Sequence, residues 1–431
     1  MTALPTRQCE LLVVGAGMAG MAAALFAARS GISTIQVGRV GQINFASGLM
    51  DLMGVHPVAA ARVRIDPWAA IRETVGENPR HPYARLNPRE IQTAFDTVTG
   101  FLGEARLPYT GLADRNSLVL TAAGTVKPTY RMPAAIGPNA EALAQGSPCR
   151  IVGFQGLKGF SARQIVETRA ADWPNLRATT LAFPPGRGDR YPEPMARYLD
   201  TPAGRERLVE RLAPHLEDET HLGFPALLGL EHSEAVRAHL STRLGRTVFE
   251  IPTMPPAVPG LRLRRAFERR LPVLGVQALH QKEVLRVETG ADGFRFEIGR
   301  REPELRVEAR GAMLATGRFF GRGLTAERTG IREPLFDLPV AQPATRGDWH
   351  RTDFLDRRGH EINRAGLETD ADFRPLNRDG APFHPRLFAV GSILAHQDWM
   401  RMKCGAGLAI ATAWRAVEGW VRAESPSSTT G

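Results

Sequence analysis

The sequence contains few of the residues that stabilise small secreted proteins or bind metal clusters. Its 431 residues include three widely separated cysteines, Cys9, Cys149 and Cys404. This number excludes a disulfide framework, and it excludes an iron–sulfur cluster held by four thiolates of this chain. The sequence therefore predicts a reducing compartment and no metal site.

Lysine is scarce. Of 55 basic residues only Lys127, Lys158, Lys282 and Lys403 are lysines, so nearly all of the positive charge is arginine. The net charge is +10 and the isoelectric point about 10.2. Either a compositional bias of the source genome or an anionic substrate, acidic partner or membrane surface explains this excess. Without a long basic run or a zinc or RNA-binding signature, nucleic-acid binding is not expected.

Long apolar runs are also lacking. Residues 11–28 carry no charge and approach the length of a membrane span, but three glycines interrupt them at the spacing of a phosphate-binding turn. No clear cleavage site and no basic leader beyond Arg7 accompany them. We therefore expect a soluble chain, and its length indicates two or three domains.

The N-terminal segment contains a GxGxxG turn between a predicted strand and a predicted helix. CELLVV at 9–14 is an apolar strand, GAGMAG follows at 15–20, and the strand ISTIQV covers 32–37. Gly15 allows the tight turn, Gly17 lets a phosphate approach the backbone, and Gly20 lets helix and strand pack closely. Met18 and Ala19 are the first residues of the predicted helix. The N–H groups at a helix N-terminus have no partner within the helix, so they can bind the phosphate. We predict a Rossmann-like flavin-binding turn.

The carboxylate that usually ends the second strand of such a fold is missing. This strand ends in Gln36, Val37, Gly38 and Arg39, none of which can accept the hydroxyls of an adenosine ribose as a carboxylate does. The absence favours FMN, and FAD held by other groups is the alternative. Arg39 is equally suited to a phosphate or to solvent.

The rest of the chain predicts an α/β fold of several parts. Strands and helices alternate from residue 149 to 252, and a meander of short strands with a hairpin turn at 290–293 leads to a final strand and helix. The predicted fold is a Rossmann-like flavin-binding domain with a β-meander, plus an inserted second α/β domain. We assign residues 1–60, 255–330 and 383–424 to the flavin domain, 61–254 to the insert, 331–382 to a capping segment and 425–431 to a disordered tail.

Further cofactor candidates have small side chains where predicted elements begin or end. A strand ending in glycine, followed by a helix that begins with small residues, directs N–H groups at the flavin edge that becomes negative on reduction. The candidates are Ser47, Gly48, Gly317, Gly391, Ser392, Gly405, Ala406 and Gly407. Cys404 directly precedes this helix, and an inert packing role is expected for it.

Together these residues resemble the B-subunit family of anaerobic glycerol-3-phosphate dehydrogenase. The strongest stretch is GRFFGRGLTAERTGIREPLFDLPVAQPATRGDWHRTDF at 317–354, and FASGLMDL at 45–52, HPY at 81–83 and RLFAVGSIL with CGAGLAIATA near the C-terminus agree with it. Order and spacing match over nearly the whole chain, although 100–250 matches more by pattern than by identity. The chain departs from the usual pattern at residues 396–399, HQDW, where a glycine-rich loop is ordinary.

The resemblance implies oxidation of sn-glycerol 3-phosphate to dihydroxyacetone phosphate, with electrons passed to a quinone. It implies FMN as the cofactor, and it implies two partners: a second flavoprotein, which is the A subunit, and an iron–sulfur membrane anchor, which is the C subunit. Because this chain offers neither cluster ligands nor a membrane span, its electrons need another protein to leave. We therefore expect a cytoplasmic protein held at the inner face of the cell membrane by a partner.

Oxidation of a secondary alcohol needs a base and a cationic phosphate clamp. His396 is the predicted base, because it lies between the flavin strand and the flavin helix. Arg332 and Arg346, with Arg318, are the clamp candidates. Two alternatives stay open: an electron-relay subunit that does not bind substrate, and a fumarate-reductase-like or steroid-dehydrogenase-like flavoenzyme.

Overall fold

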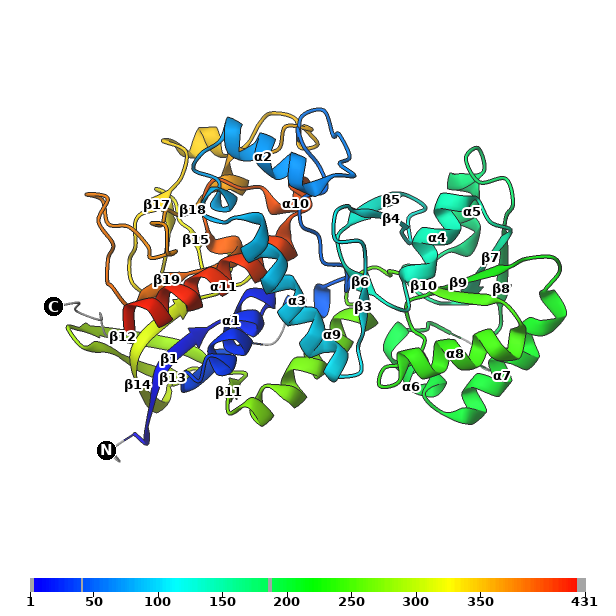
Figure 1. Ribbon diagram of the computed structural model, residues 1–431, viewed down its shortest axis with the longest axis horizontal. Coiled ribbons are helices and arrows are strands. Elements are labelled where there is room, and N and C mark those ends of the chain that lie inside the picture. The colour runs from blue at the N-terminus through cyan, green and yellow to red at the C-terminus, as the bar shows by residue number, and fades with distance from the viewer. Residues whose placement is uncertain (1–3, 40–41, 185–187, 425–431) are drawn as a thin grey trace. The chain divides into compact units, whose positions relative to one another are not determined.

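The computed structural model describes residues 4–39, 42–184 and 188–424, and the predicted tail at 425–431 lies outside them. The chain forms two compact units. The first comprises residues 1–42, 51–98 and 267–431, and the second comprises 43–50 and 99–266. Figure 1 shows the elements of each unit.

The first unit is built on a seven-stranded sheet of order β11-β2-β1-β14-β13-β12, with β19 beside β14. Its strands are β1 (Thr6–Val14), β2 (Thr34–Gly38), β11 (Gln277–His280), β12 (Glu283–Gly290), β13 (Gly293–Gly299), β14 (Pro303–Leu314) and β19 (Leu387–Ala389). Strands β11, β2, β1, β14 and β19 run parallel, and β12 and β13 form the antiparallel meander. The predicted Rossmann-like α/β architecture with a β-meander is confirmed.

Helices α1 (Met18–Arg29) and α11 (Gly405–Glu424) pack against each other and lie side by side in Figure 1, coloured blue and red. Close packing is possible because α1 buries a run of small residues, Ala22, Ala23, Ala24 and Ala27, each with no exposed surface. The predicted hairpin turn is present, since Gly290 pairs with Gly293 where β12 meets β13. These elements hold the ends of the parallel strands in place.

The segment 51–98 belongs to the first unit, although the predicted insert began at residue 61. It contains α2 (Pro67–Glu77), η2 (Pro82–Arg85) and the start of α3 (Pro88–Glu104). Arg85 donates to the carbonyls of Thr369 and Asp370 at 2.7 and 3.0 Å. Arg415 of α11 forms an ion pair with Glu90 of α3 at 2.8 Å. These long-range contacts, which periodicity does not reveal, move the boundary to residue 99.

Short elements complete the first unit. They are η4 (Pro272–Leu274), β15 (Thr325–Ala326), β16 (Ile331–Arg332), β17 (Val340–Ala341), η5 (Arg346–Trp349), η6 (Glu361–Arg364), β18 (Gly366–Leu367), η7 (Gly391–Ile393) and α10 (Trp399–Met402). Phe336 lies in the predicted capping segment, and Phe383 follows the end of that segment. The rings of Phe336 and Phe383 meet edge to face, and Phe336 also contacts Phe294 of β13. This aromatic cluster fixes part of that segment to the meander.

The second unit has a parallel four-stranded sheet of order β10-β9-β7-β8 with its own apolar core. Two helices, η1 (Gln42–Phe45) and α9 (Val258–Arg270), cross the boundary between the two units in the sequence. The other elements of the second unit are β3 (Tyr109–Thr110), β4 (Ser117–Leu120), β5 (Val126–Thr129), β6 (Met132–Pro133), α4 (Gly137–Gln145), β7 (Cys149–Phe154), α5 (Ala162–Arg169), β8 (Leu176–Leu181), α6 (Pro192–Leu199), α7 (Pro202–Leu212), η3 (Ala213–His215), β9 (His221–Pro225), α8 (Ser233–Leu244) and β10 (Thr247–Ile251). Residues 226–230 follow β9 as a buried loop. None of the described helices is both long and apolar enough to cross a bilayer.

Candidate functional site

The ends of five parallel strands meet at one edge of the first unit's sheet. Val14 of β1 stands opposite Val37 of β2 and Leu314 of β14, and Leu314 also stands opposite Ala389 of β19. On the outer side, β11 aligns His280 with Gly38. Crevices at the carboxyl ends of parallel strands are where open α/β sheets bind ligands.

The glycine turn has the tight geometry expected of a phosphate site. Gly15 has a φ of +135°, and a Cβ placed there would lie 2.2 Å from the carbonyl oxygen of Ala315. A Cβ on Gly20 would lie 2.1 Å from the carbonyl oxygen of Gly15. Gly17 is the N-cap residue of α1 and has an extended backbone. Because glycine has no side chain, no side chain at the N-cap position accepts a hydrogen bond from the first N–H groups of the helix.

Two glycines near the C-terminus, Gly391 and Gly407, pack against different neighbours. A Cβ on Gly391 would lie 2.7 Å from Cβ of Ala19, so the turn after β19 touches the start of α1. Gly391 donates its N–H to Thr412 of α11 at 2.9 Å. Gly407 instead packs on the segment after residue 50: its N–H donates to the Asp51 carbonyl at 2.8 Å. Gly405 and Ala406 begin α11, and Ser392 follows Gly391 in η7.

This cradle fits a phosphate-bearing flavin. The chain packs closely on itself at Gly15, Gly20 and Gly391, so a side chain at any of them would displace the turn that faces the start of α1. Thr316 directly follows the Ala315 carbonyl that packs on Gly15, and its hydroxyl is buried with no hydrogen-bond partner in the described part of the chain. Gly317, next in sequence, has a φ of +68°. A buried hydroxyl without a partner beside a glycine turn is the kind of group that a bound ligand satisfies.

Two predicted cofactor residues, Ser47 and Gly48, belong to the second unit. The Ser47 hydroxyl accepts the N–H of Leu49 at 3.4 Å. Gly48 has a φ of +81°, its carbonyl accepts the Tyr109 hydroxyl at 2.8 Å, and a Cβ there would lie 2.8 Å from Pro259. Their part in flavin binding stays a prediction.

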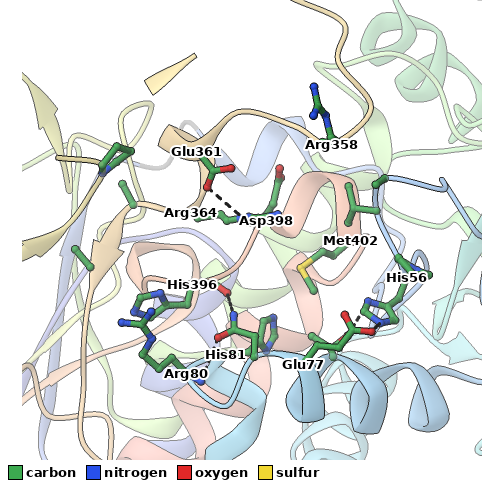
Figure 2. A pocket seen from close by; sticks show the side chains of 18 of the residues that line it. His56, Glu77, Arg80, His81, Arg358, Glu361, Arg364, His396, Asp398 and Met402 are labelled. Atoms are coloured by element: carbon green, nitrogen blue, oxygen red, sulfur yellow. Dashed lines mark hydrogen bonds and ion pairs between the residues drawn. The ribbon is translucent and has the colours of Figure 1, made fainter. Parts of the chain in front are cut away.

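A cavity of about 890 Å³ lies in the first unit (Figure 2). It is lined by residues 56–59, the end of α2, the connection 78–81, the segment 341–368 and the loop 396–402. His396 lines it with a φ of +64°. Its Nε2 lies 2.6 Å from Oε1 of Glu368, and its carbonyl accepts the side-chain amide of Asn78 at 3.1 Å. When Nε2–H donates to Glu368, the lone pair of the ring stands on Nδ1. His396 can therefore act as a base whose protonated form Glu368 stabilises.

A second cavity histidine, His81, is fully buried. Its Nδ1 accepts the backbone N–H of Tyr83 at 3.2 Å, and its Nε2 has no hydrogen-bond partner among the described residues. Burial, together with the charges of His396, His56 and Arg85, lowers the pKa of His81 to about 3, and burial has the largest effect. His81 is therefore neutral at physiological pH, with its proton on Nε2.

Four arginines line the cavity, and they differ in how firmly they are held. Arg351 pairs with Glu361 at 3.1 Å. Arg358 pairs with Asp356 at 2.6 Å and holds the pKa of that carboxyl well below its usual range. By contrast, Arg80 stands 3.6 Å from Glu368, and Arg364 stands 3.6 Å from Glu361. These two guanidinium groups make only loose ion pairs, which an incoming anion can replace.

The arginines predicted from sequence lie elsewhere and do not line this cavity. Arg332 pairs with Asp337 at 2.7 Å, and Arg346 donates to the Glu327 carbonyl at 2.9 Å while covering the Trp349 ring. Arg318 donates to carbonyls of the loop before α10, and burial lowers its pKa to about 10. Sequence reasoning missed Arg80, Arg364 and Glu368. His81 is part of the HPY stretch that supported only the family resemblance.

Two other features carry no chemistry. Burial raises the pKa of the Cys404 thiol well above its ordinary value, and this outweighs any effect of the adjacent helix N-terminus. Among the described residues, one cluster has the spacing of a possible metal site: the carboxylates of Glu217, Asp218 and Glu219 lie close together. The guanidinium of Arg177 contacts all three, so it already neutralises part of their charge.

Known proteins resemble the chain over nearly its full length. A sequence model of the FAD binding domain family matches residues 10–408. A Halobacterium salinarum protein, named as the probable B subunit of anaerobic glycerol-3-phosphate dehydrogenase, is 33% identical over 430 residues, covering 95% of this chain and 97% of the relative. The corresponding B subunit of Vibrio vulnificus is 28% identical over 426 residues, 95% of each chain. Among solved structures, a 3-ketosteroid delta1-dehydrogenase from Sterolibacterium denitrificans covers 97% of this chain and all of its own at 11% identity and a TM-score of 0.44, which is too distant to inform function.

Proposed function

Because the chain belongs to the family of anaerobic glycerol-3-phosphate dehydrogenase B subunits, we propose that its cavity binds sn-glycerol 3-phosphate and that the subunit oxidises it to dihydroxyacetone phosphate. The chain is a flavoprotein subunit of this oxidoreductase, as the resemblance implied. The observation that carries the proposal is the His396–Glu368 pair in a cavity with two loosely held arginines.

In the proposed reaction the hydroxyl proton of the substrate moves to Nδ1 of His396. The imidazolium that forms is stabilised by Glu368, whose Oε1 lies 2.6 Å from Nε2. The glycine turn at Gly15 and Gly20 would hold a flavin, which would supply the acceptor for the hydride that leaves the carbon bearing this hydroxyl. The Nε2–H of His81 is a neutral donor suited to the oxygen that becomes a carbonyl.

We propose that Arg80 and Arg364 bind the phosphate. Arg80 comes from the α2–η2 connection and lies beside His396 in Figure 2, whereas Arg364 comes from η6 and its side chain lies beside Glu361 and Asp398. The N–H of His396 donates to the carbonyl of Arg364 at 2.9 Å, so the base and one arm of the clamp are fixed to each other. Phosphate bound by both guanidinium groups gains charge-assisted hydrogen bonds that exceed the loose pairs it displaces.

The cofactor is a flavin, and we propose FAD. The matching family is described as FAD-binding, which favours FAD over the predicted FMN. FMN is not confirmed, and chromatography of the flavin released by heat distinguishes the two. We also propose that electrons leave through a second flavoprotein and an iron–sulfur anchor protein to a quinone, which would keep this chain at the membrane surface.

Reduction of the bound flavin by substrate tests the proposal. Anaerobic addition of sn-glycerol 3-phosphate to the flavin-loaded chain should bleach the flavin absorbance. His396→Gln should slow the bleaching by about 100-fold or more, within the range of general-base contributions. His215→Gln, at an exposed position of the second unit, is the control and should bleach as the wild type does.

If the isolated chain is not reduced by substrate but is reduced by a reduced partner protein, it is the electron-relay subunit instead. If His396→Gln bleaches at the wild-type rate, His396 is not the base.

A further inference from the structure

We propose that Asn78 is a positioning residue, which holds the base His396, the phosphate-binding Arg80 and the neutral donor His81 in one fixed arrangement. The inference rests on the function proposed above and assigns a role to a residue outside the base, the clamp and the donor. Asn78 offers an amide donor and an amide acceptor on its side chain and a carbonyl acceptor on its backbone. Each of these three groups is used by a different residue of the cavity.

Two of the contacts are local, because Asn78 lies where the chain leaves α2 and turns toward η2. It is the C-cap residue of α2, and its N–H donates to the carbonyl of Thr74 at 2.9 Å. Its side-chain oxygen accepts the N–H of Arg80 at 3.2 Å, as asparagine does in many turns. Its carbonyl accepts the N–H of His81 at 2.9 Å. The turn that carries Arg80 and His81 is therefore fixed to the end of a helix.

The third contact of Asn78 joins residues 318 positions apart in the sequence. The side-chain nitrogen donates to the carbonyl of His396 at 3.1 Å. His396 has a φ of +64°, and such a conformation persists in a residue other than glycine only where neighbouring groups hold it. On its other side, the N–H of His396 donates to the carbonyl of Arg364 at 2.9 Å. Both backbone groups of the base are thus held by residues that line the cavity.

Asn78 also closes a ring of contacts among four residues. Nε2 of His396 lies 2.6 Å from Oε1 of Glu368, and the same oxygen lies 3.6 Å from Nη1 of Arg80. The N–H of Arg80 leads back to Asn78, whose amide leads back to His396. The pair of Arg80 with Glu368 is the loose contact that the substrate phosphate replaces. Among these four residues, Asn78 is then the link that keeps Arg80 at a fixed place relative to the base.

Two substitutions separate the contact with His396 from the contact with Arg80. Asn78→Ser retains an oxygen that can accept the Arg80 N–H, as serine does in similar turns, but its side chain ends one bond short of the donating nitrogen. Asn78→Ala removes both side-chain contacts. In the anaerobic bleaching assay, Asn78→Ser should lower the rate at saturating sn-glycerol 3-phosphate about tenfold, because the base is misplaced. Asn78→Ala should show the same loss and also raise the half-saturating concentration about fivefold, the effect of one hydrogen bond.

Hydrogen–deuterium exchange of the amides at 393–399 measures the support of His396 without any substrate. Both Asn78 variants should exchange there about fivefold faster than the wild type, as expected when one hydrogen bond is lost. Asn87→Ala is the matched control, because Asn87 also accepts a local N–H, that of Glu90 at 2.9 Å, and does not line the cavity. This variant should change neither the exchange at 393–399 nor the bleaching.

Three results would overturn the inference. Unchanged exchange in Asn78→Ala would show that Asn78 does not hold His396. Faster exchange with a wild-type bleaching rate would make Asn78 a structural residue only, and a wild-type rate at saturation in Asn78→Ser would confine its role to the turn before Arg80. The proposed function fails separately, if sn-glycerol 3-phosphate does not bleach the wild-type protein, and the exchange at 393–399 then still decides whether Asn78 positions His396.

Discussion

Acidification from about pH 7 to about pH 5 should destabilise the first unit through one buried side chain, His81. This residue has no exposed surface, and burial lowers its pKa from 6.5 to about 3. Below pH 6.5 the unfolded chain binds a proton at His81 that the folded chain does not bind. Stability is therefore complete above the unfolded pKa and is lost as the pH falls toward the folded pKa.

The size of the effect follows from the same pKa values. Each pH unit below the unfolded pKa of 6.5 costs about 1.4 kcal/mol. At about pH 5 the contribution of His81 to the free energy of unfolding should have fallen by about 2 kcal/mol relative to about pH 7. A loss of that size is a large fraction of the stability of an ordinary domain.

Urea unfolding of the flavin-loaded protein at both pH values measures this loss, with flavin release reporting on the first unit. His81→Asn retains a side-chain acceptor for the Tyr83 N–H and does not titrate, so its loss on acidification should be smaller by about 2 kcal/mol. His215→Gln removes an exposed histidine and should keep the wild-type pH dependence. If His81→Asn loses as much stability as the wild type, His81 is not the buried neutral histidine described above.

Other changes test the cradle and the cavity. Gly15→Ala should yield protein with little bound flavin, because its Cβ would lie 2.2 Å from the Ala315 carbonyl oxygen at a φ of +135°; full flavin content on purification would contradict this. Arg364→Gln should raise KM for sn-glycerol 3-phosphate about tenfold or more with a smaller change in kcat, and an unchanged KM in steady-state assays would remove Arg364 from the clamp. Cys404 should resist alkylation in the native protein at neutral pH, because burial raises its pKa; mass spectrometry showing rapid labelling would refute its buried state.

The parts of the site that depend on local sequence could be predicted. The glycine turn requires close backbone approach at positions 15 and 20, and only glycine permits it, so the spacing of these residues predicts the geometry. The hairpin at 290–293 and the small-residue helix after Gly405 are local in the same sense. The family resemblance was confirmed by relatives that match nearly the whole chain.

The parts of the site that depend on long-range contacts could not be predicted from the sequence. Glu368 meets His396 across 28 positions, and Arg80 comes to the same cavity from much earlier in the chain. Asn78 meets His396 across 318 positions. Arginine is common in this sequence, so residue type alone could not separate Arg364 in the cavity from Arg332 in a surface ion pair.

The discontinuity of the first unit also has a consequence for synthesis on the ribosome. Strand β1 is made first, but its neighbour β14 is made only after residues 99–266, and the helix α11 that packs on α1 is made near the end of translation. Residues 99–266, by contrast, contain a whole parallel sheet and its core within one stretch of chain. We expect this stretch to fold while the alanine-rich face of α1 is still exposed, because α11 has not yet been made. The exposed apolar face makes the nascent N-terminal segment a substrate for chaperones. Deleting α11 should therefore expose that face permanently and turn the chain toward aggregation.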